Sequence, residues 1–125
     1  MSEVIETRTA KMWMGADGII RVHFLGIDEA TLAEAQEYLV AFKQLAGDRK
    51  RPMLGVMGEV RSAPRPIREY LIREGPRYQS AVALLVKSPM SRIIANFFLG
   101  LNKPAIPLRL FNNEAEAIEW LKGFL

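Results

Sequence analysis

The 125-residue chain contains no cysteine and a single histidine, His23. Without cysteine it can form no disulfide, no thiol nucleophile and no thiolate metal site. One imidazole cannot form a histidine cluster for zinc, and no Asp or Glu within the predicted strand stands beside His23 to share a metal or a proton. The sequence therefore predicts no metal site, no cofactor and no catalytic residue, and we expect a non-enzymatic protein.

Phosphate-binding, hydrolase and targeting motifs are also missing. The segment 55–58, Gly-Val-Met-Gly, is too short for a phosphate-binding loop, and no Gly-x-Ser-x-Gly elbow occurs. The acidic, mixed N-terminus differs from a signal peptide. The longest uncharged apolar run, 93–102, is about half of the roughly 20 residues that a membrane span needs. These absences predict a soluble, cytoplasmic protein without a transmembrane segment.

The net charge of +3 is unevenly distributed along the chain. Between Arg49 and Arg77, eight Lys or Arg stand against three Glu. Such a basic middle suits an acidic protein partner, a phosphate or nucleic acid. Pairs at helical spacing, such as Arg65–Glu69 and Glu69–Arg73, are equally typical of an ordinary solvated helix. Because no Lys/Arg stripe is interleaved with aromatics, the pattern disfavours nucleic acid.

The apolar pattern predicts strands alternating with helices. The predicted strands are residues 9–14, 19–25, 52–60, 80–86 and 107–111, and the predicted helices begin at Thr31, Arg65, Ser88, and Asn112 or Asn113. Asp17-Gly18 between the first two strands is typical of a tight hairpin turn. The order β-β-α-β-α-β-α-β-α predicts a single α/β domain, 1–125, with a mixed, mostly parallel five-stranded sheet and four helices. We expect residues 1–8 to be a flexible N-terminus.

The first predicted helix carries local signals at both ends. Residues 31–34, Thr-Leu-Ala-Glu, form a capping box, and Gly47 is the expected residue after its C-terminus. The expected buried stripe of this helix is Leu32, Ala35, Tyr38, Leu39, Phe42, Leu45 and Ala46.

The C-terminal half resembles a known family. The apolar strand 80–86 is followed by Ser88-Pro89 and an apolar helix, then by Leu-Arg-Leu-Phe at 108–111 and Asn-Glu-Ala-Glu-Ala-Ile-Glu-Trp-Leu at 113–121. This order and ending resemble the SpoIIAA-like members of the STAS (STAS/Sec14-like) domains, from about Thr9 onward. The motifs mark a fold rather than an active site, so the resemblance implies a STAS-like architecture.

The resemblance also implies a place for regulation. In anti-sigma-factor antagonists of this family, a serine in an Asp-Ser-Ser/Thr-Gly type sequence is phosphorylated where the helix after the third strand begins. Here Arg65 stands near that position and no Asp-Ser pair is present. The nearest hydroxyl, Ser62, lies between arginines that would hold a phosphate. The alternative is that Ser62 only satisfies a turn. We therefore predict a protein-interaction or regulatory module without the phosphoserine switch, whose partner surface is Arg61, Ser62, Arg65 and Arg68.

The predicted helix 90–101 supports an alternative function. Its apolar residues follow helical spacing, and those expected to shape a pocket or a dimer surface are Met90, Ile94, Phe97, Phe98 and Leu101. The simplest interpretation is a helix packed on the sheet; the others are a dimer surface, a lid over an apolar pocket and a peripheral membrane contact. The resemblance to Sec14-like proteins implies a carrier of a small apolar or lipid-like ligand. A homodimer through Leu99 or the hairpin edge is a further expectation.

A weaker candidate anion site lies where the same helix begins. Ser88, Ser91 and Arg92 follow a predicted buried parallel strand, and helix N-termini at the carboxyl ends of such strands bind anions. A plain N-cap role for Ser88 explains the same residues without a ligand.

Overall fold

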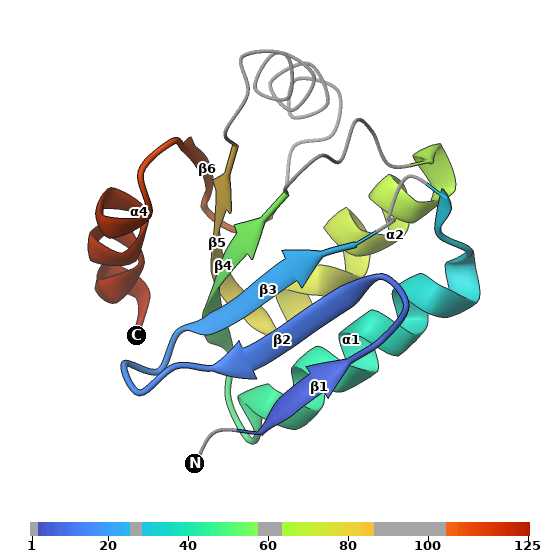
Figure 1. Ribbon diagram of the computed structural model, residues 1–125, viewed down its shortest axis with the longest axis horizontal. Helices are drawn as coiled ribbons and strands as arrows, with labels where there is room; N and C mark the ends of the chain where they lie inside the picture. The colour runs from blue at the N-terminus through green and yellow to red at the C-terminus, as the bar shows by residue number, and fades with distance from the viewer. Residues whose placement is uncertain (1–2, 26–28, 58–63, 87–104) are drawn as a thin grey trace.

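The computed structural model describes residues 3–25, 29–57, 64–86 and 105–125. These residues form a mixed, mostly parallel sheet of six strands in the spatial order β1-β2-β3-β4-β5-β6 (Figure 1). The strands are β1 (Val4–Glu6), β2 (Ala10–Met14), β3 (Ile20–Phe24), β4 (Arg51–Val56), β5 (Gln79–Leu85) and β6 (Leu108–Phe111). The β1–β2 and β2–β3 pairs are antiparallel, whereas β3 to β6 pair in parallel. The predicted α/β class is therefore confirmed.

Helices cover both faces of this sheet. The described helices are α1 (Leu32–Ala46), α2 (Arg65–Glu74) and α4 (Glu114–Leu121), with 3-10 turns η2 (Gly75–Arg77) and η3 (Lys122–Phe124). Helices α1 and α2 lie on one face, and α4 lies on the other, against β4, β5 and β6 (Figure 1). In the described part of the chain, no helix is long and apolar enough to cross a membrane.

The predicted count of five strands is wrong, because residues 4–6 form a sixth strand where we expected a flexible terminus. The Thr7 amide donates to the Ala10 carbonyl at 2.8 Å, and this turn brings β1 back alongside β2. Ile5 packs against the core beneath α1. Three residues are too few to show a periodicity in the sequence, so pairing with β2 is what makes this segment a strand.

One predicted strand differs in extent, and one predicted helix lies outside the described residues. Strand β4 ends at Val56 rather than at residue 60, and residues 58–63 lie outside the described part of the chain. Three of the four predicted helices are described. The fourth, predicted from Ser88 to Leu101, falls on residues outside the described ranges.

The local signals around the hairpin and α1 are confirmed. Gly18 has a φ of 85° in the turn between β2 and β3, a conformation that glycine adopts without strain. The Glu34 amide donates to the Thr31 hydroxyl at 3.2 Å, and the Thr31 amide donates to the Glu34 carboxylate at 3.0 Å, which completes the capping box.

Strand alternation divides the core into two layers. Met12, Ile20 and Val22 pack with Tyr38 and Phe42 beneath α1. On the other face, Ile19, Leu54, Ala81 and Ala83 pack with Ala117 and Leu121 of α4. The predicted stripe of α1 is largely correct, but Leu32 is 46% exposed because it lies in the first turn, at the end of the layer.

Candidate functional site

Most of the residues that we predicted to be functional lie outside the described part of the chain. These residues are Arg61, Ser62, Ser88, Met90, Ser91, Arg92, Ile94, Phe97, Phe98, Leu99 and Leu101. The apolar pocket, the anion site and half of the partner surface therefore stay predictions.

Two residues of the predicted partner surface, Arg65 and Arg68, lie in the described part of the chain. Arg65 is exposed in the first turn of α2 and donates to Glu69 at 2.8 Å, which confirms that helical pair. This hydrogen bond raises the pKa of Arg65. Arg68 is half-buried. In place of the second predicted pair, Glu69–Arg73, Arg73 pairs with Glu74 at 3.4 Å. Helix α2 thus presents Arg65 and Arg73 to solvent near its two ends.

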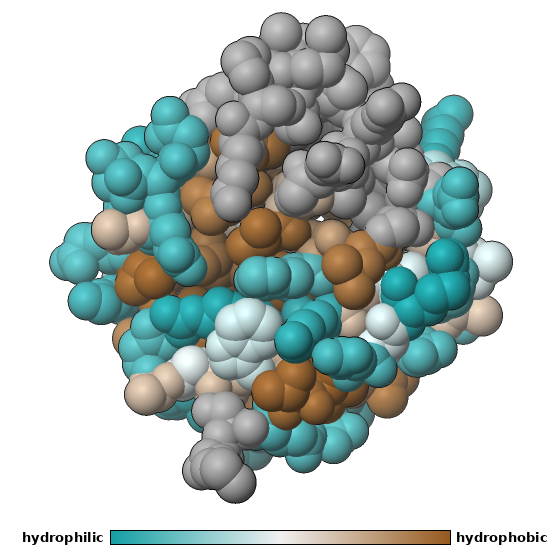
Figure 2. All heavy atoms as spheres, in the orientation of Figure 1, coloured by the Kyte–Doolittle hydropathy of each residue, from teal (hydrophilic) through white to brown (hydrophobic). Residues whose placement is uncertain are grey.

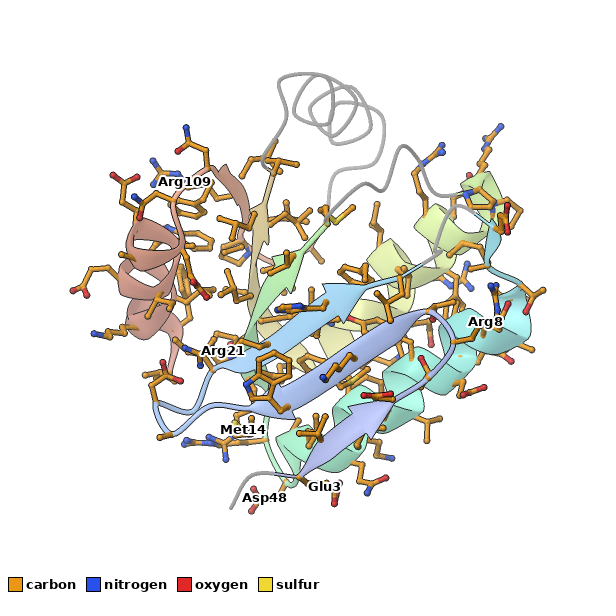
Figure 3. The ribbon with its side chains drawn as sticks, in the orientation of Figure 1. Glu3, Arg8, Met14, Arg21, Asp48 and Arg109 are labelled. Atoms are coloured by element: carbon orange, nitrogen blue, oxygen red, sulfur yellow. The ribbon has the colours of Figure 1, made fainter. Side chains whose placement is uncertain are left out.

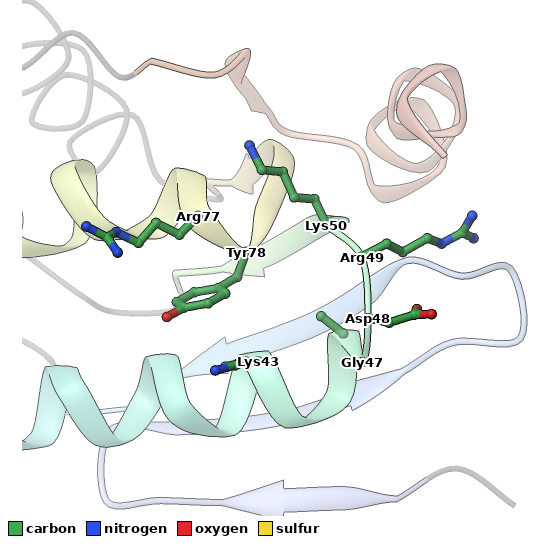
Figure 4. A pocket seen from close by; sticks show the side chains of 8 residues that line it. Lys43, Gly47, Asp48, Arg49, Lys50, Arg77 and Tyr78 are labelled. Carbon is green, nitrogen blue, oxygen red and sulfur yellow. The ribbon is translucent and has the colours of Figure 1, made fainter.

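A basic pocket of about 260 Å³ lies beyond the C-terminus of α1. It is lined by Lys43, Ala46, Gly47, Asp48, Arg49, Lys50, Arg77 and Tyr78 (Figure 4). It is located at the edge of the sheet where β4 and β5 begin. The anion site predicted at Ser88 follows β5, so the two candidates belong to opposite ends of that strand.

The pocket is assembled by the end of α1 and the start of two strands. The Gly47 amide donates to the Lys43 carbonyl at 3.0 Å and Gly47 has a φ of 77°, so α1 stops there and the chain turns towards β4. The Arg51 amide then donates to the Tyr78 carbonyl at 3.1 Å. This bond joins the two segments, so that Arg49 and Lys50 line the same pocket as Arg77.

The electrostatics of the pocket are strongly positive. Four cations line it against one carboxylate, Asp48. The Lys43 Nζ atom lies 5.8 Å from the centre of the Tyr78 ring, a cation–π arrangement. Glu74 partly offsets the charge at one end, because it pairs with Arg77 at 3.3 Å.

The directions of the cationic side chains decide what they can bind. Lys43 and Tyr78 approach each other, whereas Arg49, Lys50 and Arg77 extend away in different directions (Figure 4). A single small anion cannot reach all four cations in this arrangement.

The sequence indicated the positive charge of this region but no pocket, since the predicted partner surface was Arg61, Ser62, Arg65 and Arg68. Arg49, Lys50 and Arg77 belong to the basic middle, for which an acidic partner was one of the three expected ligands. The sequence did not indicate Lys43 or Tyr78. Lys43 lies in α1, outside the basic middle, and Tyr78 is an ordinary aromatic next to Arg77. Only the pairing of β4 with β5 brings them together.

His23 lies on an exposed part of the sheet. Its ring centre is 5.1 Å from that of Trp13, and its register partner on β2 is Lys11 (Figure 3 shows this face). Within the described ranges, no group of three or more His, Cys, Asp or Glu side chains is placed to hold a metal ion.

Comparison with known proteins identifies a family. A family model described as a domain of unknown function, DUF7793, matches residues 12–125. A solved structure of a protein with unknown function from Arthrobacter sp. FB24 is 33% identical in sequence, over 88% of this chain and 96% of that chain, with a TM-score of 0.34. No curated protein matches the chain.

Proposed function

Because the chain belongs to the DUF7793 family, a domain of unknown function, we propose its role from its own residues: it is a non-enzymatic protein-interaction module that binds an acidic segment of a protein partner. The observation that carries the proposal is the gathering of Lys43, Arg49, Lys50 and Arg77 around one pocket with a single carboxylate. The exposed arginines of α2 extend the same positive surface, since Arg73 and Arg77 share Glu74.

The spacing of the charges favours a peptide over a nucleic acid. Asp48 and Glu74 stand among the cations and repel any anion that lies against them. A peptide can place neutral residues there, whereas every nucleotide carries a phosphate. A peptide can place its carboxylates against the lysines and arginines and its backbone amides against Asp48. Tyr78 offers one half-buried ring, not a row of rings on which bases could stack.

The test uses a fluorescein-labelled deca-glutamate peptide and the full-length protein. Binding is followed by fluorescence anisotropy at low ionic strength, where interactions between exposed charges are strongest. We expect the deca-glutamate peptide to bind more tightly than a deca-glutamine peptide, and more tightly than a labelled oligothymidylate of the same number of residues.

Charge reversal locates the binding surface. Lys43→Glu and Arg77→Glu each place a carboxylate in the pocket, and we expect either change to raise the Kd for deca-glutamate about tenfold or more. Lys122→Glu is the matched control, because Lys122 is half-exposed in η3 beyond α4 and also pairs with a single glutamate, Glu119. Arg65→Glu measures how far the surface extends along α2.

Two results contradict the proposal. One is a wild-type Kd in both folded pocket variants, which places the binding surface elsewhere. The other is tighter binding of oligothymidylate than of deca-glutamate, which makes the ligand a nucleic acid. A circular dichroism spectrum of each variant verifies its fold.

A further inference from the structure

The sheet face opposite α1 is exposed over β1, β2 and β3 (Figures 1 and 2). Side chains of register partners point to the same face of a sheet, so two rows of them cross these strands. The rows are Val4, Trp13 and Arg21, and Glu6, Lys11 and His23. Helix α4 packs on the same face farther along, against β4, β5 and β6.

Val4, Trp13 and the neighbouring His23 give this face a centre that contains one aliphatic and two aromatic side chains. Val4 is 51% exposed. Beside it, the half-buried Trp13 ring packs against the exposed His23 ring. Figure 2 shows apolar and pale side chains among hydrophilic ones over these strands. An aromatic centre with a polar surround is the usual composition of a protein interface.

The charges on this face are balanced, unlike those around the basic pocket. Lys11 Nζ lies 3.7 Å from Glu6 Oε1; the Lys11 side chain is about half exposed and that of Glu6 about two-thirds. Arg21 donates to Asp17 at 2.9 Å, and this bond lowers the pKa of Asp17. The positive charge of Arg21 is therefore offset within the chain. The face therefore favours neither an acidic nor a basic partner.

A second copy of the chain matches these features. In a two-fold symmetric interface the same patch of each copy meets the other. A charge on the patch is therefore matched only if the patch also carries a charge of opposite sign. Glu6 and Lys11 are such a pair, on neighbouring strands and opposite each other in register. We propose that two copies associate through this face, with the two sheets packed face to face, Trp13 at the centre, and Glu6 of each copy beside Lys11 of the partner subunit. The basic pocket, beyond the C-terminus of α1, is lined by other residues and is not part of this interface.

Sedimentation equilibrium of the full-length chain over a micromolar to submillimolar range tests this proposal. We expect the wild type to reach twice the chain mass of 14.1 kDa. Lys11→Glu and Glu6→Lys each set like charges against each other and should raise the dimer Kd about tenfold or more. The double variant Glu6→Lys/Lys11→Glu should restore the dimer, since the pairs within and between copies re-form with reversed polarity. Lys122→Glu is the control with an unchanged Kd.

Three outcomes overturn the proposal: a wild type that stays at 14.1 kDa throughout the range, single variants that both keep the wild-type Kd, and a folded double variant that stays monomeric. The substituted side chains are exposed on a three-residue edge strand and on its neighbour, so circular dichroism should report an intact fold for each variant.

Discussion

At the scale of single residues, a buried polar trio joins α1 to the sheet. The Tyr38 hydroxyl accepts a hydrogen bond from Gln79 Nε2 at 3.1 Å and lies 3.0 Å from Met53 Sδ. Burial raises the pKa of Tyr38 well above its ordinary value, so the phenol stays neutral and can donate to the sulfur. Each member comes from a different element, α1, β4 or β5, so the trio fixes how these elements meet.

We predict that the two hydrogen-bonding members of this trio are energetically coupled. Tyr38→Phe leaves the Gln79 amide with only the weak sulfur contact at 3.4 Å, and Gln79→Leu removes the donor to the phenol. Each change should lower the free energy of unfolding by about 1–3 kcal/mol, the cost of a buried polar group without its partner. The double variant should cost less than the sum, as measured by urea denaturation. Additivity within about 0.5 kcal/mol would mean that the pair is uncoupled.

A second residue-scale prediction concerns Gly55, the last residue but one of β4. A Cβ atom there would lie 2.8 Å from Leu84 Cδ2 and 3.0 Å from Met53 Cε. We expect Gly55→Ala to destabilise the protein by about 1 kcal/mol, because the ends of the Leu84 and Met53 side chains must shift to admit a methyl group. Gly123→Ala is the control, since a Cβ at Gly123 would meet nothing within 4 Å. Equal denaturation midpoints for the two variants would contradict the prediction.

At the scale of elements, the N-terminus of α1 is tied to the turn between β1 and β2. Arg8, in that turn, donates through Nη2 to Glu34 at 2.7 Å and to the Glu29 carbonyl at 3.2 Å. Glu34 is also the return partner of the Thr31 capping box. One carboxylate therefore caps the helix and holds the edge of the sheet against it.

This contact gives a pH-dependent prediction. The hydrogen bond from Arg8, followed by that from the Thr31 amide, lowers the pKa of Glu34 from 4.5 to about 2. A depressed carboxylate pKa means that Glu34 contributes its full stabilisation above about pH 4.5 and loses it as the pH falls towards 2. We expect Arg8→Ala to raise the pKa of Glu34 towards 4.5, as measured by NMR titration of the carboxyl carbon.

Thr31→Ala is the comparison for that titration. It removes the smaller hydroxyl contribution and keeps the Arg8 bond, so the pKa of Glu34 should rise less than in Arg8→Ala. An unchanged Glu34 pKa in Arg8→Ala would show that the capping box alone depresses it.

Elements with a local signal could be predicted from the sequence, and β1 could not. The hairpin has Asp17-Gly18, and α1 has its capping box and an apolar stripe, so both were predicted correctly. Strand β1 has three residues, and its identity depends on pairing with a strand several residues away. The end of β4 was misplaced because apolar residues continue past Val56, where the strand stops.

At the scale of the whole molecule, the basic pocket and the exposed sheet face are formed by different elements. The pocket residues belong to the end of α1, the 47–50 connection, η2 and Tyr78, which follows η2. The exposed face belongs to β1, β2 and β3 and lies on the side of the sheet opposite α1. A single chain can therefore present both surfaces at once.

We predict that the two surfaces function independently. Lys11→Glu should leave the Kd for deca-glutamate within a factor of about two of the wild type, because Lys11 does not line the pocket and shares no ion-pair partner with its cations. Lys43→Glu should leave the sedimenting mass unchanged. Measuring both quantities on both variants separates the two proposals. A single variant that alters both would show that dimerisation and peptide binding share a surface.

The carrier hypothesis is tested at this scale as well. Native mass spectrometry of the gently extracted protein should show an added apolar ligand if Met90, Ile94, Phe97, Phe98 and Leu101 shape a pocket. A spectrum of the bare chain mass would contradict it.

The sequence by itself determined the α/β class, the hairpin turn, the cap of α1 and the uneven charge, because each of these depends on residues close together in the chain or on composition alone. Tertiary structure decided the sixth strand and the position of the basic pocket. Lys43 and Tyr78 are 35 positions apart in the sequence, and they meet because β4 pairs with β5 just beyond the end of α1. The absence of cysteine and the single histidine exclude thiol chemistry and histidine-cluster metal sites. The pairing of strands decides which cations line the same pocket.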